Sequence, residues 1–404
     1  MASSEGVALI YAPEGVDPRA IFAGRPLIDR AIALAETAGL TPYVVGAADA
    51  PCPSGVDRVA PGGRLPVDLL PRTNVVLWRC DVAWVARTLQ AVLRDGSGTR
   101  TVALDDRGRP AVVRLTATRL AGRVPATLEL AAGGATAIGA PGQVAGNRLI
   151  ALDAGGAGRF RAAEAELVAT LDNPRDGVFD RVFNRPISRR VTPFLLSWPI
   201  TPNQVTVLSL AVGLLAAVAL AQSGYLWPIA GALLLQLTAV LDCVDGEIAR
   251  AKVLESEWGE LLDITTDSVI HVVVFLGMAA HAWPALGVDV AWALGALFAT
   301  GGFASFVVVT RAERSEERWR PIDDWQARLL ARMLATLTTR DLSVLVLAAA
   351  ASGMLTQLLV GASFGAHAFW VSALALHTSL MRRAAGPPGP ARVAAPTAER
   401  RARS

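Results

Sequence analysis

The fold of this chain is decided by residues 242–267, DCVDGEIARAKVLESEWGELLDITTD, which stand between two long apolar segments. The stretch carries two pairs of aspartates, Asp242 with Asp245 and Asp263 with Asp267. Their spacings of three and four residues place each pair on one face of a helix. Because the linker between the pairs is short, we expect antiparallel neighbouring helices whose acidic faces oppose each other. Four converging carboxylates repel one another, and hard divalent cations relieve that repulsion, so the stretch predicts a magnesium or manganese site.

Small residues and one arginine occupy positions between the aspartates. Gly246 and Ala249 continue the first acidic face with almost no side chain, which leaves room for a ligand against the backbone. Arg250 follows at the expected water boundary, where its planar guanidinium suits a phosphate. Gly259 opens the second helix and permits close helix approach. Aspartates that cap helices and pair with arginines are the structural alternative, which four interleaved carboxylates disfavour.

Long apolar segments surround this stretch and follow from residue 200 onward. The chain is 52% hydrophobic and 18% charged, and its three cysteines are scattered, so disorder and a disulfide scaffold are excluded. A net charge of +3 is too small to indicate nucleic acid. Helical spans need ~17–25 apolar residues. The predicted spans are 204–222, 225–242, 260–283, 287–309, 341–361 and 364–382.

Arginines are concentrated in the predicted loops on one side of these spans. Residues 310–340 alone carry seven arginines, whereas the three alternate loops carry neither lysine nor arginine. By the positive-inside rule, both termini, the soluble part and the acidic site are expected on the cytoplasmic side of an integral membrane protein. The apolar residues of 178–198 recur at spacings of three and four between arginines, which predicts an interfacial amphipathic helix bent near Pro186.

The predicted fold class is therefore two-part, a soluble α/β domain followed by an all-α domain of six transmembrane helices. The soluble part alternates strands at 7–11, 42–45 and 74–78 with a helix at 27–38, which is typical of an α/β layer. The predicted ranges are 1–170 for the α/β domain, 171–199 for the interfacial segment, 200–385 for the membrane domain and 386–404 for a disordered basic tail.

The specified positions of residues 242–267 resemble the signature of the CDP-alcohol phosphotransferase (CDP-alcohol phosphatidyltransferase) family, in the order Asp242-x2-Asp245-Gly246-x2-Ala249-Arg250-x8-Gly259-x3-Asp263-x3-Asp267. Eight positions over 26 residues on the expected pair of spans make the match specific. The entry to the first span, Pro202-Asn203-x2-Thr206, also resembles the family pattern. The resemblance extends over roughly residues 170–385.

The resemblance implies a transferase that moves a substituted phosphate from a CDP-alcohol to a hydroxyl acceptor and releases CMP, in phospholipid or polyol-phosphodiester synthesis. It implies a two-metal Mg²⁺ or Mn²⁺ site held by Asp242, Asp245, Asp263 and Asp267. Asp267 would also be the base that deprotonates the acceptor hydroxyl. The implied CDP-binding residues are Asn203, Thr206, Asp242, Gly246, Ala249, Arg250 and Gly259. The arginines that could meet an acceptor phosphate are Arg185, Arg189, Arg311 and Arg314.

The soluble part resembles the nucleotidyltransferase superfamily over residues 18–39, PRAIFAGRPLIDRAIALAETAG, and Asp81 stands where that superfamily keeps a metal-binding aspartate. It departs from the pattern because Arg19 replaces the catalytic lysine and the glycine-rich loop is shortened. We therefore interpret it as a degenerate nucleotidyltransferase-like domain. The domain order resembles that of bifunctional inositol-1-phosphate cytidylyltransferase/di-inositol-phosphate phosphate synthases.

Two alternative functions and the oligomeric state remain open at this stage, and the intact eight-position motif disfavours a third alternative, a non-catalytic membrane anchor for the soluble domain. The same carboxylates could serve a membrane cation transporter, although they lie at one membrane edge rather than at the midplane. The soluble domain could be an active cytidylyltransferase, which would make the protein bifunctional. A homodimer is suggested by the family resemblance and by the small residues Gly301, Gly302 and Ala304, a spacing that ordinary span packing also explains. The sequence leaves the donor's alcohol and the acceptor undetermined.

Overall fold

The structure is a computed structural model of the 404-residue chain. It describes residues 6–13, 16–46, 52–64, 74–94, 100–116, 120, 123–141, 143–144, 147–152, 157–171, 176–322, 324–337 and 342–384. Two compact units are present. The first comprises Met1–Ala216 with Leu233–His271, and the second comprises Ala217–Ala232 with Val272–Ser404. The tail predicted at 386–404 lies outside the described residues. The other predicted domain ranges were drawn from composition, and their boundaries differ from those of the two units.

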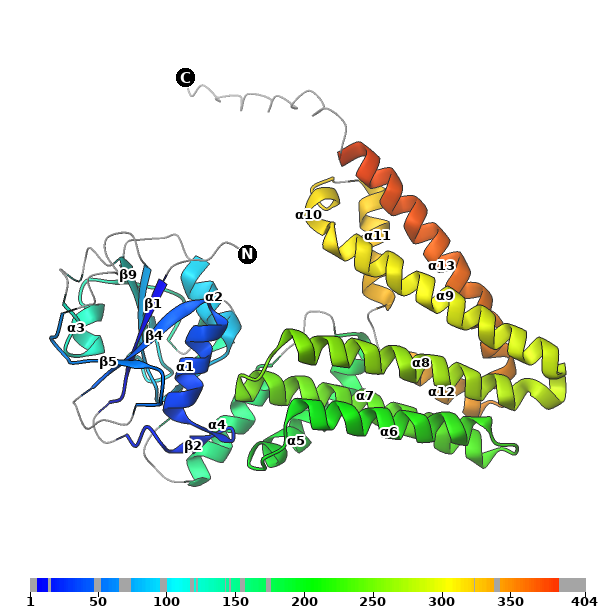
Figure 1. Ribbon diagram of the computed structural model, residues 1–404, viewed down its shortest axis with the longest axis horizontal. Coiled ribbons are helices and arrows are strands. Elements are labelled where there is room, and N and C mark those ends of the chain that lie inside the picture. The colour runs from blue at the N-terminus through cyan, green and yellow to red at the C-terminus, as the bar shows by residue number, and fades with distance from the viewer. Residues whose placement is uncertain are drawn as a thin grey trace, which may run out of the picture. The chain divides into compact units, whose positions relative to one another are not determined.

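The N-terminal part of the first unit is a mixed seven-stranded sheet (Figure 1). Its order is β10-β8-β9-β6-β1-β4-β5. The central strand β1 (Gly6–Tyr11) is parallel to both β4 (Leu40–Val45) and β6 (Asn74–Arg79), whereas β9 (Pro110–Thr116) is antiparallel to β6 and to β8 (Arg100–Leu104). The edges are β10 (Thr136–Ala137) and β5 (Asp57–Val59). The α/β fold class predicted from the sequence is confirmed.

Helices cover both faces of this sheet. Helices α1 (Leu27–Thr37) and α2 (Ala86–Arg94) lie on one side, and α3 (Leu128–Ala132) lies on the other (Figure 1). Alternate residues of one strand face opposite sides, so Ile10 joins the core under α1 while Leu9 joins the core under α3. Burial on both faces explains why the whole of β1 is apolar.

The sheet domain is fastened to the C-terminal end of α7 (Leu226–Lys252). Arg25 donates through Nη1 to the carbonyls of Lys252 and Val253, at 3.0 and 3.1 Å. Arg30, 3% exposed, donates to the Ala251 carbonyl at 3.2 Å. Burial, with a smaller contribution from Arg25, lowers the pKa of Arg30 to about 9. Helix carbonyls without intrahelical partners attract such cations, so the soluble domain caps α7.

Lysine is used once in this chain, and Lys252 contributes to the same junction. Its Nζ donates to the carbonyls of Trp198 and Ile200, at 2.8 and 2.9 Å. Val253 follows with a φ of 55°, which is unusual for a β-branched residue. This left-handed turn lets Leu254 donate its N–H to the Ala249 carbonyl at 2.8 Å, which closes the helix end.

Residues 178–198 form a helical segment before the first span. A π-helical turn at Asp180–Asn184 leads into α5 (Arg185–Leu196), so Pro186 lies in the first turn of α5. Proline is tolerated in a first turn, and the helix continues past it. Large apolar side chains of this segment are exposed, namely Val178, Phe179, Val182, Phe183, Val191, Phe194 and Trp198. These exposed side chains are the ones expected of an amphipathic interfacial helix.

Five of the described helices are long and apolar enough to cross a membrane. They are α6 (Pro202–Ala221), α7, α8 (Glu257–Leu286), α9 (Val288–Arg314) and α13 (Leu355–Ala384). The predicted span 341–361 is interrupted instead. Its first part is α12 (Leu342–Ala351), which at 1.5 Å per residue is about 15 Å long, and α13 begins after the turn at Ser352 and Gly353. The prediction of six continuous spans is therefore not confirmed.

Glycines allow close helix contacts in both units. In the first unit, a Cβ on Gly213 of α6 would lie 2.6 Å from Cγ1 of Ile270 in α8, so these helices approach more closely than an alanine would allow. In the second unit, a Cβ on Gly301 of α9 would lie 2.8 Å from Cδ2 of His367 in α13. Gly301 therefore has a packing role inside the chain. The short connecting helices of the second unit are α10 (Glu316–Trp319) and α11 (Trp325–Leu337).

Candidate metal centre

Helices α7 and α8 bring three aspartates together. One carboxylate oxygen from each of Asp242, Asp245 and Asp263 lies within 4.8 Å of the others. Asp242 and Asp245 are each 6% exposed, and Asp263 is half-buried. The three-residue spacing on α7 accounts for the first pair, and the short turn between the helices places α8 beside it. Three acidic side chains this close are electrostatically unfavourable without a cation.

Asp267 lies one helical turn beyond Asp263 on α8 and is half-buried. Its charge acts on Asp245, and that of Asp263 acts on Asp267, so the fourth carboxylate belongs to the same electrostatic cluster. The close three-oxygen group comprises the other three aspartates. Asp267 is thus placed at the margin of the cluster, where a carboxylate can act on a second ion or on a substrate.

The start of α6 supports the cluster from a third helix. Thr206 is 4% exposed and donates through Oγ1 to Asp245 Oδ2, at 2.7 Å. Asn203 lies against Gly259, because a Cβ there would be 3.4 Å from Asn203 Oδ1. Positions predicted from two separate sequence patterns therefore meet in space. A Cβ on Gly259 would also stand 3.1 Å from Ser256 Oγ, so the glycine allows close packing of Asn203 and Ser256 at this position.

The guanidinium of Arg250 folds back over Gly246. A Cβ on Gly246 would lie 3.3 Å from Arg250 Nη1 and 3.4 Å from Nη2, so a glycine at this position leaves room for the arginine. Gly246 directly follows Asp245 in α7. Arg250 and Ala249 are both partly exposed. The charged groups that act on Arg250 include Glu247 and Glu255.

A buried ion-pair network on the opposite side of α7 was not anticipated in full from the sequence. Glu247 is 0% exposed and accepts hydrogen bonds from Arg185 Nη1 at 2.9 Å, Ser188 Oγ at 2.7 Å and Thr192 Oγ1 at 2.6 Å. Arg185 also contacts both carboxylate oxygens of Asp176, at 2.8 and 3.0 Å. Despite burial, these partners raise the pKa of Arg185 above its ordinary value. The network locks α5 onto the helix that carries Asp242 and Asp245.

The four arginines expected near an acceptor phosphate lie in different settings. Arg185 is 3% exposed and engaged by two carboxylates, which favours a structural role for it. Arg189, one turn along α5, is half-buried. Arg311 and Arg314 are exposed in the last turn of α9, which belongs to the second unit. Of the two arginines of this set in the first unit, Arg189 fits the predicted binding of an acceptor phosphate better than Arg185.

The soluble domain holds Asp81 in an ion pair of its own. Arg79 donates through Nε and Nη2 to the two carboxylate oxygens of Asp81, at 2.8 and 2.7 Å, and Asp81 is 2% exposed. Burial opposes the charge of Arg79, but Asp81 and Asp105 together raise its pKa. Arg19, at the position of the catalytic lysine, is exposed. A carboxylate neutralised in this way is poorly suited to a metal, which supports a degenerate domain.

The donor set at the α7–α8 cluster suits a hard divalent cation. Carboxylate oxygens from two helices offer all-oxygen ligation, and a cation would neutralise the negative charge that they concentrate. The residues present therefore fit a metal ion of the kind predicted from the sequence.

Comparison with known proteins agrees with this site. Residues 199–363 match the family model of the CDP-alcohol phosphatidyltransferases, which identifies this part of the chain as a domain of that family. The family is metal-dependent and uses CDP-alcohol donors and hydroxyl acceptors. The five apolar helices of this chain are consistent with an integral membrane protein.

Several curated relatives are similar to parts of the chain. A "Bifunctional IPC transferase and DIPP synthase" of Aquifex aeolicus is 35% identical over 123 residues, which is 30% of this chain and 27% of that protein. The protein of the same name from Rubrobacter xylanophilus is 32% identical over 189 residues, 47% of this chain and 39% of that protein. A phosphatidylinositol phosphate synthase of Mycobacteroides abscessus is 33% identical over 119 residues, 28% of this chain and 53% of that protein. The matches thus span roughly a quarter to a half of these relatives.

Proposed function

Because residues 199–363 form a CDP-alcohol phosphatidyltransferase domain, we propose that the protein transfers a substituted phosphate from a CDP-alcohol to a hydroxyl acceptor and releases CMP. The observation that carries the proposal is the convergence of three aspartate oxygens within 4.8 Å on two neighbouring helices. In the reaction, the acceptor oxygen loses its proton and bonds to the phosphorus bearing the alcohol. The bond from that phosphorus to the CMP oxygen breaks, and CMP leaves with the electron pair.

We assign the metal-binding role to Asp242, Asp245, Asp263 and Asp267, and Mg²⁺ or Mn²⁺ is the proposed ion. Two such ions would neutralise the charge of the diphosphate and of the departing CMP. Thr206 fixes the rotamer of Asp245 through its 2.7 Å hydrogen bond. This fixed geometry is the protein's contribution to a site whose chemistry depends mostly on positioning.

We assign proton removal to Asp267 and phosphate binding to Arg250. Asp267 lies at the margin of the acidic cluster, so its carboxylate can reach an acceptor hydroxyl while its neighbours hold cations. The Arg250 guanidinium lies over Gly246, next to Asp245, where it would meet the donor's diphosphate. The contact between Asn203 and Gly259, with Ala249 on α7, would complete the pocket for the CDP group.

The substrates and the setting are proposals of the same kind. Relatives named as phosphatidylinositol phosphate and IPC transferase/DIPP synthases favour an inositol phosphate or a similar polyol phosphate as acceptor. CDP-diacylglycerol and a CDP-polyol are both candidate donors. The arginine-rich loops favour a cytoplasmic active site, with the exposed apolar face of residues 178–198 on the membrane surface. A homodimer, if formed, would be detected by cross-linking in lipid nanodiscs.

The proposed activity is tested by mass spectrometry of the purified protein in nanodiscs. The protein is incubated with CDP-diacylglycerol or CDP-inositol, Mg²⁺ and a panel of polyols and their phosphates, and CMP and product are quantified. Asp267→Asn should lower CMP release by about 10²-fold or more, since positioned general bases contribute 10²–10⁴-fold. Asp289→Asn, an exposed aspartate at the start of α9, is the matched control and should behave as wild type.

Near-normal CMP release by Asp267→Asn would exclude that residue as the base and leave the proposed reaction in place. A different outcome would reject the reaction itself. Cation flux through proteoliposomes without any CMP formation would instead indicate a transporter that uses the same carboxylates. A bifunctional enzyme would reveal itself by forming a CDP-alcohol from CTP, which the Arg79–Asp81 pair makes unexpected.

A further inference from the structure

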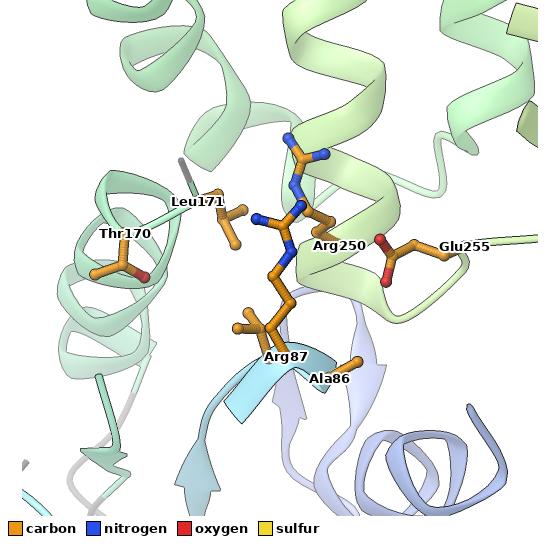
Figure 2. A pocket seen from close by; sticks show the side chains of 7 residues that line it. Ala86, Arg87, Thr170, Leu171, Arg250 and Glu255 are labelled. Carbon is orange, nitrogen blue, oxygen red and sulfur yellow. The ribbon is translucent and has the colours of Figure 1, made fainter. Parts of the chain in front are cut away.

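A pocket lies where the end of α7 meets the soluble domain, within the first unit (Figure 2). It is lined by Arg87 in the first turn of α2, Thr170 and Leu171 just after α4 (Ala157–Ala169), Arg250 near the end of α7, and Glu255 in the following loop. Residues of the soluble domain and of α7 therefore line the same pocket.

Two guanidinium groups meet at this pocket. Figure 2 shows Arg87 extending from α2 toward the guanidinium of Arg250, with the Glu255 carboxylate on the other side of Arg250. Two arginines and one glutamate are the charged side chains that line this pocket. The first turn of α2, a helix of nine residues, also lines the pocket, and the N-terminus of a helix carries a partial positive charge. The charges at this pocket therefore favour an anion.

The hydrogen-bonding state of Arg250 points the same way. Its Nε and Nη2 atoms are buried, and among the described residues none accepts a hydrogen bond from them. A buried cationic donor left without an acceptor is costly, and a neighbouring like charge adds to that cost. An anionic acceptor in the pocket would remove both penalties. A phosphate group suits paired guanidinium groups especially well, because its oxygens accept several charge-assisted hydrogen bonds.

We propose that Arg87 of the soluble domain and Arg250 of the membrane domain together bind a phosphate group of a substrate. The inference deepens the proposed function and rests on it, because Arg250 packs over Gly246 on α7, the helix that also carries Asp242 and Asp245. The phosphate can come from two sources, the diphosphate of a CDP-alcohol donor or the monoester of a phosphorylated acceptor. In either case the soluble domain contributes a binding residue to the membrane enzyme without catalysing a reaction itself.

Equilibrium binding to the full-length protein in nanodiscs tests this assignment without relying on turnover. Calorimetric titration in Mg²⁺ uses CDP as the diphosphate probe, cytidine as its phosphate-free control and glycerol 3-phosphate as the monoester probe. The variants are Arg87→Ala, Arg87→Lys and Arg250→Ala, and the matched control is Arg94→Ala, an exposed arginine in the last turn of α2.

We expect Arg87→Ala to weaken binding of one phosphate probe by about 10-fold or more, as is usual for a hydrogen bond to a charged group. Weaker binding of CDP with unchanged glycerol 3-phosphate would identify the donor, and the reverse would identify the acceptor. Arg87→Lys should recover part of the affinity, and it also provides the measurement if the alanine variant does not fold. Arg94→Ala should bind both probes as wild type does.

The proposal is overturned if Arg87→Ala binds both probes normally while Arg250→Ala does not, a result that would leave the proposed function intact. It is also overturned if both arginine variants bind normally. If the wild-type protein binds neither probe and releases no CMP from any donor, the proposed function fails together with this inference. The two failures are therefore distinguished by the behaviour of wild type and of Arg250→Ala.

Discussion

Glu247→Ala removes the acceptor at the centre of the buried network between α5 and α7. The side chain is 0% exposed and accepts three hydrogen bonds, at 2.9, 2.7 and 2.6 Å, from Arg185, Ser188 and Thr192. Removing one partner of a buried ion pair costs about 3–5 kcal/mol. Arg185 keeps both of its contacts with Asp176, which moves the expected cost toward the lower end of that range.

The two hydroxyl donors increase this cost. Ser188 and Thr192 are both buried and would lose their carboxylate acceptor, at about 1 kcal/mol each. Because the members of one network are not additive, we expect a total of about 4 kcal/mol. At about 2–4 °C per kcal/mol for domains of 150–250 residues, the unfolding midpoint should fall by on the order of 10 °C. Glu247→Gln keeps the shape of the side chain and one acceptor oxygen. Its unfolding midpoint should lie between those of Glu247→Ala and wild type.

The assay is thermal unfolding of the detergent-solubilised protein, followed by tryptophan fluorescence. Glu257→Ala is the matched control, because this glutamate is exposed in the first turn of α8 and its removal should cost less than about 1 kcal/mol. A shift of 2 °C corresponds to a loss of about 1 kcal/mol or less. An unfolding midpoint of Glu247→Ala within about 2 °C of wild type would therefore refute the reasoning. Arg185→Lys separates the two roles considered for Arg185. A structural role predicts a lower midpoint, whereas acceptor binding predicts a raised KM for the acceptor at an unchanged midpoint.

Three further predictions concern metal binding, helix contact and the soluble domain. Mg²⁺ should raise the unfolding midpoint of wild type and of Asp289→Asn but have little effect on Asp263→Asn, and an equal effect on all three would argue against the assigned ligands. Gly213→Ala should lower the stability measured by unfolding in detergent by about 1–3 kcal/mol, since its Cβ would lie 2.6 Å from Ile270. Adding Ile270→Ala to this variant should restore part of the loss. No restoration would mean that the strain arises elsewhere. Asp81→Asn should destabilise the protein by about 3 kcal/mol, because it breaks the buried pair with Arg79. CMP release per folded molecule should stay unchanged. Mg²⁺-dependent CTP binding by wild type that is lost in Asp81→Asn would contradict the interpretation of a degenerate domain.

Local patterns predicted the elements that local forces determine. The strand expected at 7–11 is Gly6–Tyr11, and the helix expected at 27–38 is Leu27–Thr37. Spacings of three residues on α7 likewise put Asp242 and Asp245 on one face, because the period of a helix does not depend on its partners. Placing Asp263 opposite them required the further expectation that a short loop joins antiparallel neighbours, and the 4.8 Å cluster agrees with it.

Features that depend on distant partners were not readable in this way. The donors to Glu247 are 55 to 62 residues away in sequence, so its environment is set by packing of α5 on α7. A carboxylate inside an apolar helix was the available signal, and it indicated a partner without naming it. The interrupted span at 341–361 shows the complementary problem. Average hydropathy reports apolar content, whereas the break depends on Gly353 adopting a φ of 68°.

Contacts of the soluble domain connect it to α7, the helix that carries Asp242, Asp245 and Arg250. Its Asp81 is neutralised by Arg79, so the position expected to bind a metal instead stabilises the domain. Its Arg25 and Arg30 donate to the last carbonyls of α7, within three residues of Arg250. A residue at a helix end is normally free to fray, and these bonds restrain it. The soluble domain therefore restrains the end of the helix that carries Arg250, the residue proposed to hold phosphate, and this restraint requires only the fold of the domain.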